Sequence, residues 1–208
     1  MIVLIPTPLP ISQALAASTP AQVEAITRLV QQSAGAYNDI KEKYGSHTAV
    51  ASAYNEIDKS VTKNLSQPFQ KTISCKKGCS YCCEQLVAVS VDEAQYILDM
   101  ARENKIHIDW KKARDQASRG IDSWIDRGKE KRTCVFLKDG ACSIYEVRPG
   151  TCRNYHAYSP PDQCDVTNKD GSPVVPSLLH ANAILAGIWY KQKTASLPSM
   201  LLKLRRKK

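Results

Sequence analysis

Residues 75–83 read CKKGCSYCC and bring four thiols together within a single short stretch. Four more cysteines follow before residue 165, and no cysteine lies outside these two groups. The eight cysteines are Cys75, Cys79, Cys82, Cys83, Cys134, Cys142, Cys152 and Cys164. Thiolates bind zinc, iron and iron–sulfur clusters, and short spacings let one loop wrap a single centre. The pattern therefore predicts a domain organised around a thiolate-bound metal.

A disulfide framework is the alternative, and it requires an oxidising compartment. Residues 1–18 read MIVLIPTPLPISQALAAS, an apolar stretch that ends in small residues as a cleaved signal does. The stretch lacks an initial Lys or Arg, and Pro6, Pro8 and Pro10 interrupt it. We therefore interpret it as an extended strap on the body of the protein, and we expect a cytoplasmic protein. No apolar run reaches the ~18 residues of a transmembrane helix.

The net charge of the 208-residue chain is +9, from 29 Lys and Arg against 20 Asp and Glu. The last six residues, KLRRKK, hold five of the basic side chains, so the rest is only mildly basic. Such a tail could bind nucleic acid, but it lacks interleaved aromatic residues, and we interpret it as a solvated terminus. The sequence identifies no protein partner or substrate.

Helical spacing of apolar residues dominates the first third of the chain. A cap at Ser18 and Thr19 with Pro20 begins one helix, and Gly45 ends it. A second helix follows and ends before Pro68, so residues 19–66 form a predicted helical hairpin.

Three more helices are predicted further along the chain. A capping box at residues 90–93 opens one, and Asp109 caps another that ends at Gly128. Residues 129–132, KEKR, are interpreted as a solvated connector. Residues 177–191 are apolar almost all round, which predicts a buried helix.

Two short β-prone runs flank Asp139-Gly140, which predicts a hairpin that brings Cys134 and Cys142 close together. Cys152 begins a short helix, and Cys164 lies in an irregular proline-rich loop over residues 159–176. The expected fold is mainly α with a small β-hairpin, a helical domain built around a cysteine-ligated metal or iron–sulfur centre. Its expected parts are a strap and helical hairpin (1–70), a cysteine-cluster metal-binding domain (71–170), and a buried C-terminal helix with a basic tail (171–208).

The CKKGCSYCC motif, followed by CVFLKDGACSIYEVRPGTCR at residues 134–153, resembles the YkgJ-like cysteine-cluster family. That family is described as a zinc- or iron-chelating domain, and the resemblance covers about residues 71–165. It implies that the first seven cysteines are the metal-binding set, with Cys164 where many members carry a further cysteine. One flagellin lysine methylase resembles the family in carrying such a region.

The spacing Cys75-x3-Cys79-x2-Cys82, with Tyr81 before the third thiol, also resembles the radical-SAM signature. That superfamily needs several alternating strand–helix units after the motif. The segment after Cys83 instead predicts two helices, one hairpin and one helix, so we do not favour radical chemistry.

The leading hypothesis is a metal-binding protein whose centre serves electron transfer or sensing, or supports the structure. We prefer [4Fe–4S] to zinc, because only Cys79 and Cys82 form a strict Cys-x2-Cys pair. The alternatives are a cluster-dependent modifying enzyme and a zinc-stapled interaction or nucleic-acid module, so whether the protein is an enzyme stays open.

Basic side chains next to the second cysteine group are candidate cofactor-binding residues. Arg148 and Arg153 could donate to sulfur or hold an anion. His156 could be a ligand or a proton carrier, or simply a half-buried histidine.

Two expectations concern how the centre is built. Because closing a long loop costs little entropy, one centre is expected to draw ligands from both groups. Cys79, Cys82, Cys134 and Cys152 are the predicted four. Metal binding is also expected to order residues 71–85 and 134–170, which have few apolar residues of their own.

Overall fold

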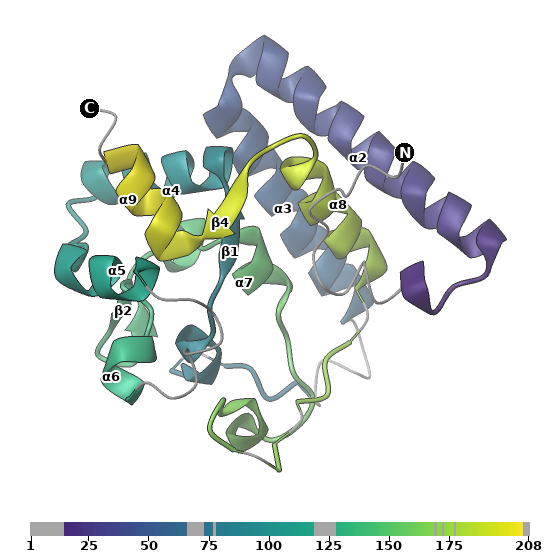
Figure 1. Cartoon of the computed structure of the whole chain (residues 1–208). Coiled ribbons are helices and arrows are strands. Elements are labelled where there is room, and N and C mark those ends of the chain that lie inside the picture. Colours follow the sequence, from purple (N-terminus) through teal and green to yellow (C-terminus); the bar gives the residue numbers. More distant parts are fainter. Residues whose placement is uncertain are drawn as a thin grey trace.

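A computed structural model describes residues 15–65, 73–76, 78–118, 128–168, 170–171, 173–176 and 178–205 (Figure 1). The predicted N-terminal strap before Leu15, the end of the fourth predicted helix and the last three residues lie outside this description. The larger elements are α2 (Pro20–Tyr44), α3 (Ser46–Asn64), α4 (Val91–Glu103), α5 (Trp110–Ala117), α8 (Leu179–Trp189) and α9 (Leu197–Arg205). The shorter ones are η2 (Tyr81–Glu84), β1 (Ala88–Ser90), α6 (Lys129–Arg132), β2 (Leu137–Lys138), β3 (Ala141–Cys142), η4 (Tyr145–Val147), α7 (Gly150–Asn154), η5 (Pro161–Cys164) and β4 (Thr194–Ser196).

Local signals set the bounds of the predicted helical hairpin. The Thr19 hydroxyl accepts from the Gln22 N–H at 3.4 Å, and the Gln22 side chain accepts from the Thr19 N–H at 2.9 Å. This capping box satisfies backbone donors that the first turn of α2 leaves open. Gly45 has a φ of +87° and lies between α2 and α3, so the chain reverses there at a residue without a Cβ. The predicted ends at Pro20 and Gly45 are confirmed.

Helix α8 packs against both α2 and α3, as predicted for a helix that is apolar almost all round (Figure 1). Its Leu185 and Ile188 join Val50 and Ile57 of α3 in one apolar core. A Cβ added at Gly187 would lie 2.8 Å from the Ala34 backbone nitrogen of α2. The two helices therefore approach each other at a position that only glycine fits.

A second core lies between α4, α5, the β2–β3 hairpin and α9. Its fully buried side chains include Ile97, Phe136, Met200 and Leu201. Here the sequence-based expectation of a solvated tail is wrong as far as residue 205, because α9 buries an apolar stripe beneath its basic side chains. Strand β4, which pairs antiparallel with β1, was not predicted either.

One buried carboxylate ties the helical hairpin and α8 to helices α4 and α7. Glu93 of α4 has no exposed surface. Its Oε1 accepts from the Tyr54 hydroxyl at 3.1 Å and the Gly150 N–H at 3.0 Å. Its Oε2 accepts from the Trp189 Nε1–H at 2.7 Å and the Ser90 N–H at 2.9 Å. Four donors from separate segments therefore converge on one side chain.

The predicted hairpin is confirmed, with Leu137 paired to Cys142 and Lys138 to Ala141. Asp139 and Gly140 have φ values of +50° and +74°. Positive φ at both central residues is what a two-residue type I′ hairpin turn requires. Within the described ranges the sheets are two antiparallel pairs, so the mainly helical fold with a small β component is confirmed. These ranges contain no parallel strands of the kind a radical-SAM barrel needs. They also contain no helix with the length and apolar character to cross a bilayer.

Candidate metal centre

The eight cysteines lie on five short segments, and all eight are free thiols. Cys75 and Cys79 lie in the loop before η2, and η2 carries Cys82 and Cys83. The second group is spread further: Cys134 follows α6, Cys142 is on β3, Cys152 is in α7 and Cys164 ends η5. Cys164 is buried and the other seven are half-buried.

Backbone hydrogen bonds join the two cysteine groups. The Cys134 N–H donates to the Cys83 carbonyl at 2.7 Å. On the other side, the Ser74 N–H donates to the Ala157 carbonyl at 2.9 Å, and the Ala157 N–H donates to Cys75 Sγ at 3.3 Å. Segments that are far apart in the sequence therefore lie side by side, which a centre with ligands from both groups requires.

The adjacent thiols of Cys82 and Cys83 have pKa values that shift in opposite directions. The Cys83 thiol donates a hydrogen bond to the Cys82 sulfur, and this bond lowers the pKa of Cys82 to about 7. The positive charge of Arg148 contributes in the same direction. The same bond raises the pKa of Cys83 far above its usual range. Cys82 is therefore the thiolate of the pair, and a thiolate is the form that binds metal.

Cys82 acts electrostatically on a first set of thiols, which belong to the second cysteine group. Burial, followed by the nearby thiols of Cys134, Cys82 and Cys142, holds the pKa of Cys152 well above its usual range. Burial also raises the pKa of Cys134 to about 11, with smaller contributions from Cys142 and Cys82. These contributions indicate that Cys134, Cys142 and Cys152 are close enough to Cys82 to act on it electrostatically.

Cys82 also acts electrostatically on a second set of thiols, which includes Cys75 and Cys164. Burial raises the pKa of Cys75, and the thiols of Cys82 and Cys79 add to this. Burial raises the pKa of Cys164 as well, with contributions from Cys75, Cys79 and Cys82. Cys82 is common to both sets, and the four predicted ligands come from both of them.

The chemistry of this donor set fits a thiophilic metal or cluster. Burial and neighbouring thiols oppose thiolate formation, and a bound cation would relieve both effects. An N–H···S bond to Cys75 and the charge of Arg148 add the stabilisation that thiolate centres use. Within the described ranges, no three His, Cys, Asp or Glu side chains already converge on one point that could hold a metal ion.

The two predicted cofactor-binding arginines have different surroundings. Arg148 stacks over the Tyr145 ring at 3.9 Å, and its charge contributes to the lowered pKa of Cys82. Burial raises the pKa of Cys142, and the charge of Arg148 offsets part of that rise. Arg153 is buried and donates to the Asp58 carboxylate and to the carbonyls of Glu146 and Arg148. Arg153 thus anchors α7 to α3, whereas Arg148 lies beside the thiols. The assignment of either one to a cofactor stays a prediction.

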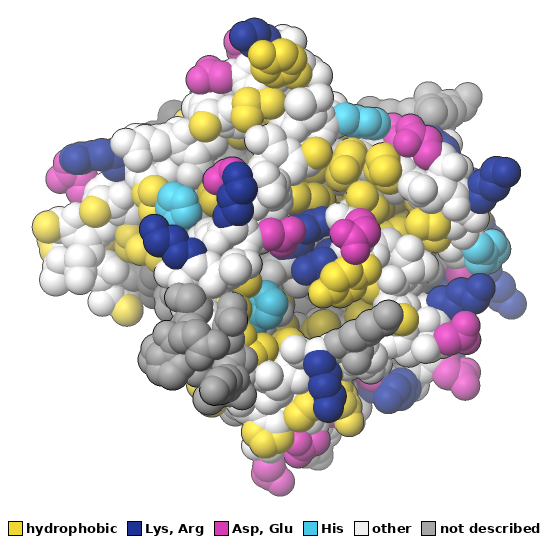
Figure 2. All heavy atoms as spheres, turned by 180° about the vertical axis from the view of Figure 1, so that it is seen from behind, with side chains coloured by type: hydrophobic (Ala, Val, Ile, Leu, Met, Phe, Trp, Pro, Cys, Tyr) yellow, Lys and Arg dark blue, Asp and Glu magenta, His cyan; other side chains and the backbone are white. Residues whose placement is uncertain are grey.

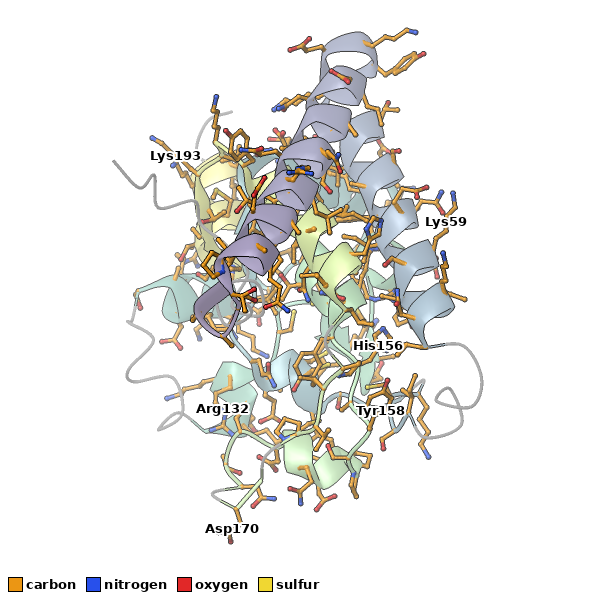
Figure 3. All side chains as sticks on the ribbon, turned by 90° about the vertical axis from the view of Figure 1, so that its right-hand side faces the viewer. Lys59, Arg132, His156, Tyr158, Asp170 and Lys193 are labelled. Atoms are coloured by element: carbon orange, nitrogen blue, oxygen red, sulfur yellow. The ribbon has the colours of Figure 1, made fainter. Side chains whose placement is uncertain are left out.

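His156 lies on the segment between Cys152 and Cys164 (Figure 3). Burial lowers its pKa, so its imidazole is neutral at pH 7. Its Nε2 lies 3.0 Å from the Arg153 carbonyl oxygen, a contact in which Nε2 carries the proton and donates. This contact fixes the ring within α7 and its following loop, and a ligand role for His156 stays a prediction.

Sequence analysis missed a buried ion pair next to the thiols. Residues 129–132 form helix α6. Its first three side chains are exposed, but Arg132 is buried, so the expectation of a solvated connector is wrong at Arg132. Arg132 Nη2 donates to Glu84 Oε2 at 3.1 Å, and Lys129 Nζ lies 3.2 Å from Glu84 Oε1. Glu84 directly follows Cys83. An acidic residue beside two thiols was the one sequence signal that could have indicated a buried ion pair here.

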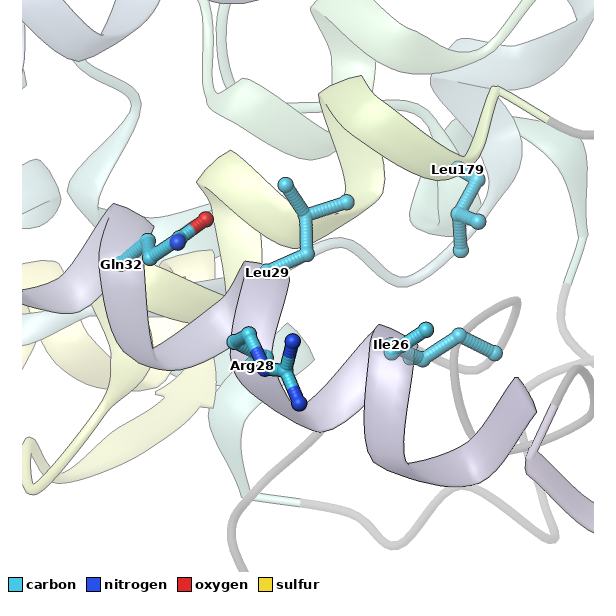
Figure 4. A pocket seen from close by; sticks show the side chains of 6 residues that line it. Ile26, Arg28, Leu29, Gln32 and Leu179 are labelled. Carbon is cyan, nitrogen blue, oxygen red and sulfur yellow. The ribbon is translucent and has the colours of Figure 1, made fainter. Parts of the chain in front are cut away.

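Two surface hollows lie away from the cysteines. One, of about 310 Å³, is lined by Ile26, Leu29 and Leu179 between α2 and α8 (Figure 4). The other, of about 670 Å³, lies between α5 and α9. On the face shown in Figure 2, basic and acidic side chains are interspersed among the residues coloured by type. Neither hollow is lined by a cysteine, so neither is a candidate substrate site next to the thiols.

Comparison with known protein families supports metal chelation. Residues 74–172 match the model of the CxxCxxCC family, described as a "Putative zinc- or iron-chelating domain". The matched segment contains all eight cysteines, and it confirms the predicted resemblance to a cysteine-cluster family. No curated protein and no solved structure matches the chain. The comparison supports a metal ligand of the thiols without choosing between zinc and iron.

Proposed function

We propose that this chain, whose residues 74–172 match a metal-chelating domain, holds a [4Fe–4S] cluster on cysteine thiolates and serves in electron transfer. The observation that carries the proposal is the position of Cys82, which acts electrostatically on six other thiols from both sequence groups. A single zinc ion needs four sulfurs at ~2.3 Å from one point. A cubane carries its thiolates on four separate iron atoms and accepts more widely spaced sulfurs.

The protein's own residues would supply the environment of such a cluster. Cys82 has a pKa lowered to about 7, which favours its thiolate form over those of the other thiols, and it is the first candidate ligand. Arg148 balances negative charge beside it. Bound there, the cluster would supply one-electron chemistry, and half-buried thiols would leave it close enough to the surface for a protein partner. A reducing compartment such as the cytoplasm suits this function, because the thiols must stay reduced.

The test is anaerobic purification of the full chain, followed by iron, acid-labile sulfide and zinc analysis with visible and EPR spectra. We expect about four iron and four sulfide per chain, a brown protein, and an EPR signal that changes on one-electron reduction. A colourless protein with stoichiometric zinc would contradict the cluster and leave a zinc-chelating domain.

A pair of variants in the same turn tests the role of the thiolate. Cys82→Ser should lose most of the iron and the colour, because it removes the one thiol shared by both sets. Ser80→Ala changes a half-buried neighbour without removing a sulfur, and it should keep wild-type iron content. Equal iron content in the two variants would exclude Cys82 as a ligand.

A further inference from the structure

The Glu84–Arg132 pair is among the most enclosed charged contacts of the described structure. Glu84 is 3% exposed and Arg132 is 4% exposed. The Arg132 guanidinium donates to the Glu84 carboxylate at 3.1 Å, and Lys129 approaches the other carboxylate oxygen from the exposed side. The pair therefore joins η2 to α6 across a region shielded from water.

This ion pair lies beside a backbone hydrogen bond that directly joins two of the cysteines. Glu84 is the next residue after Cys83, and Arg132 is two residues before Cys134. The Cys134 N–H donates to the Cys83 carbonyl at 2.7 Å. Together the ion pair and the backbone bond hold η2 and the start of the second cysteine group at two points.

Helix α5 also holds the backbone between Arg132 and Cys134. Gln116 Nε2 donates to the carbonyls of Lys131 and Thr133, both at 2.8 Å. Lys112 Nζ donates to the Thr133 hydroxyl. The backbone that leads into Cys134 is thus fixed between α5 and Glu84, so it has little freedom to change its position relative to η2.

The energetics of buried ion pairs indicate that this contact serves geometry more than stability. Desolvating both charges offsets most of their attraction, and apolar side chains of similar size often stabilise a fold equally well. An ion pair, unlike an apolar contact, is satisfied in only one arrangement of donor and acceptor. At this position, that arrangement sets where Cys83 and Cys134 lie.

We propose that Glu84 and Arg132 are positioning residues that assemble the metal centre from its two halves. The inference rests on the proposed function, because it assumes that thiols of both groups bind one centre. It adds that the geometry of the centre depends on a salt bridge between residues that do not bind the metal. Loss of the pair should weaken metal binding by about 10- to 100-fold, as loss of outer contacts does at other metal sites.

The test measures Zn²⁺ affinity of the full-length, metal-free chain by competition with a chelator, together with iron and sulfide uptake on anaerobic reconstitution. Glu84→Gln should lower Zn²⁺ affinity by about 10- to 100-fold and reduce cluster uptake. Should that variant fail to fold, Arg132→Lys is the alternative. It keeps the positive charge but loses the planar guanidinium group, and it should also lower Zn²⁺ affinity. Wild-type affinity in either folded variant would overturn the proposal.

Asp92→Asn is the matched control, because it breaks a polar network that includes neither η2 nor α6. Asp92 accepts hydrogen bonds from Tyr37, Lys41 and Gln192. This control should lower the free energy of unfolding yet keep Zn²⁺ affinity within about twofold of wild type. An equal loss of affinity in Asp92→Asn would mean that stability, and not positioning, explains the effect. A wild-type chain that takes up neither Zn²⁺ nor a cluster would instead contradict the proposed function.

Hydrogen exchange gives a readout that needs no metal. In the metal-free Glu84→Gln chain, the segment 128–136 should exchange faster than in wild type, whereas α2 and α8 should be unchanged. Unchanged exchange over residues 128–136 would show that the ion pair does not hold this segment, and it would overturn the proposal.

Discussion

Different forces order two regions of the molecule. One region is the helices α2, α3 and α8, and the other is the cysteine segments over residues 73–87 and 155–164. In the helical part, Val50, Ile57 and Ile188 are completely buried in a continuous apolar core. Among the described residues of 73–87, Glu84 is the one buried side chain, and in 155–164 only Ala157 and Cys164 are buried. Figure 3 shows the helices stacked above these irregular segments, which carry the labelled His156 and Tyr158.

The difference indicates that apolar burial orders the helices, whereas the cysteine segments need a further interaction. Apolar burial at roughly 25 cal/mol per Å² stabilises the helices by themselves. The cysteine segments have little apolar area to bury and rest on single hydrogen bonds, such as those from Ser74 and Ala157. We therefore expect metal binding to provide the rest of their order.

Removing the metal should produce the largest effect. Residues 73–87 and 155–171 should lose hydrogen-exchange protection, while α2, α3 and α8 keep theirs. The sequence-based expectation extended this loss to residues 134–147, but Phe136 and Ile144 are buried in the α4–α9 core and should keep the hairpin ordered. Uniform protection of the metal-free chain would show that the thiols are not needed for folding.

Glu93→Ala should destabilise the whole fold, because Glu93 joins the two apolar cores. The substitution leaves the Tyr54 hydroxyl and the Trp189 N–H among four buried donors without their acceptor. At about 1–3 kcal/mol for each unsatisfied donor, we expect a loss of at least 4 kcal/mol in urea unfolding. Glu103→Ala, an exposed position on the same helix, should change stability by less than about 0.5 kcal/mol. Similar values for both variants would contradict this role of Glu93.

Gly187→Ala should affect the helical part without affecting the metal. Its Cβ would meet the backbone of α2 at 2.8 Å, which forces α2 and α8 apart and should cost about 1–3 kcal/mol. Gly35→Ala is the control, because its Cβ would meet nothing within 4 Å and should stabilise α2 by up to about 1 kcal/mol. Metal content should stay at the wild-type level in both variants, and a loss of metal in Gly187→Ala would show that the two parts are coupled.

The smallest predicted effect concerns the thiolate of Cys82 in the metal-free protein. Its pKa of about 7 makes it the thiol that iodoacetamide should modify most readily at neutral pH, with the rate falling as pH decreases through 7. Arg148→Gln removes a positive charge that favours the thiolate, so the pKa should rise and the rate at pH 7 should fall by about twofold.

The exposed hairpin charge of Lys138 provides the control for this measurement. Lys138→Gln should leave the alkylation rate unchanged, because the side chain points to solvent at the tip of the hairpin. Peptide mapping would identify the modified thiol. Modification of a different cysteine first, or an equal change in both variants, would exclude this electrostatic role of Arg148.

Elements with local signals could be predicted well from the sequence. The capping box of Thr19 and Gln22 and the reversal at Gly45 depend on residues within one turn of each other, and the same is true of the Asp139-Gly140 turn. The candidate thiols were also identifiable, because a run such as CKKGCSYCC has few other uses in a reduced protein.

What the sequence alone determined is therefore the helices α2, α3, α4 and α8, the start of α5, the hairpin and the candidate metal-binding residue type. Only the tertiary structure decided which charged residues are buried and which thiols are neighbours. KEKR looks solvated by composition, yet Arg132 is buried because Glu84, 48 positions earlier, meets it there. Helix α9 was missed for the same reason, since its basic side chains concealed an apolar stripe that packs on α4. Burial depends on partners that are distant in sequence, and no local pattern contains that information.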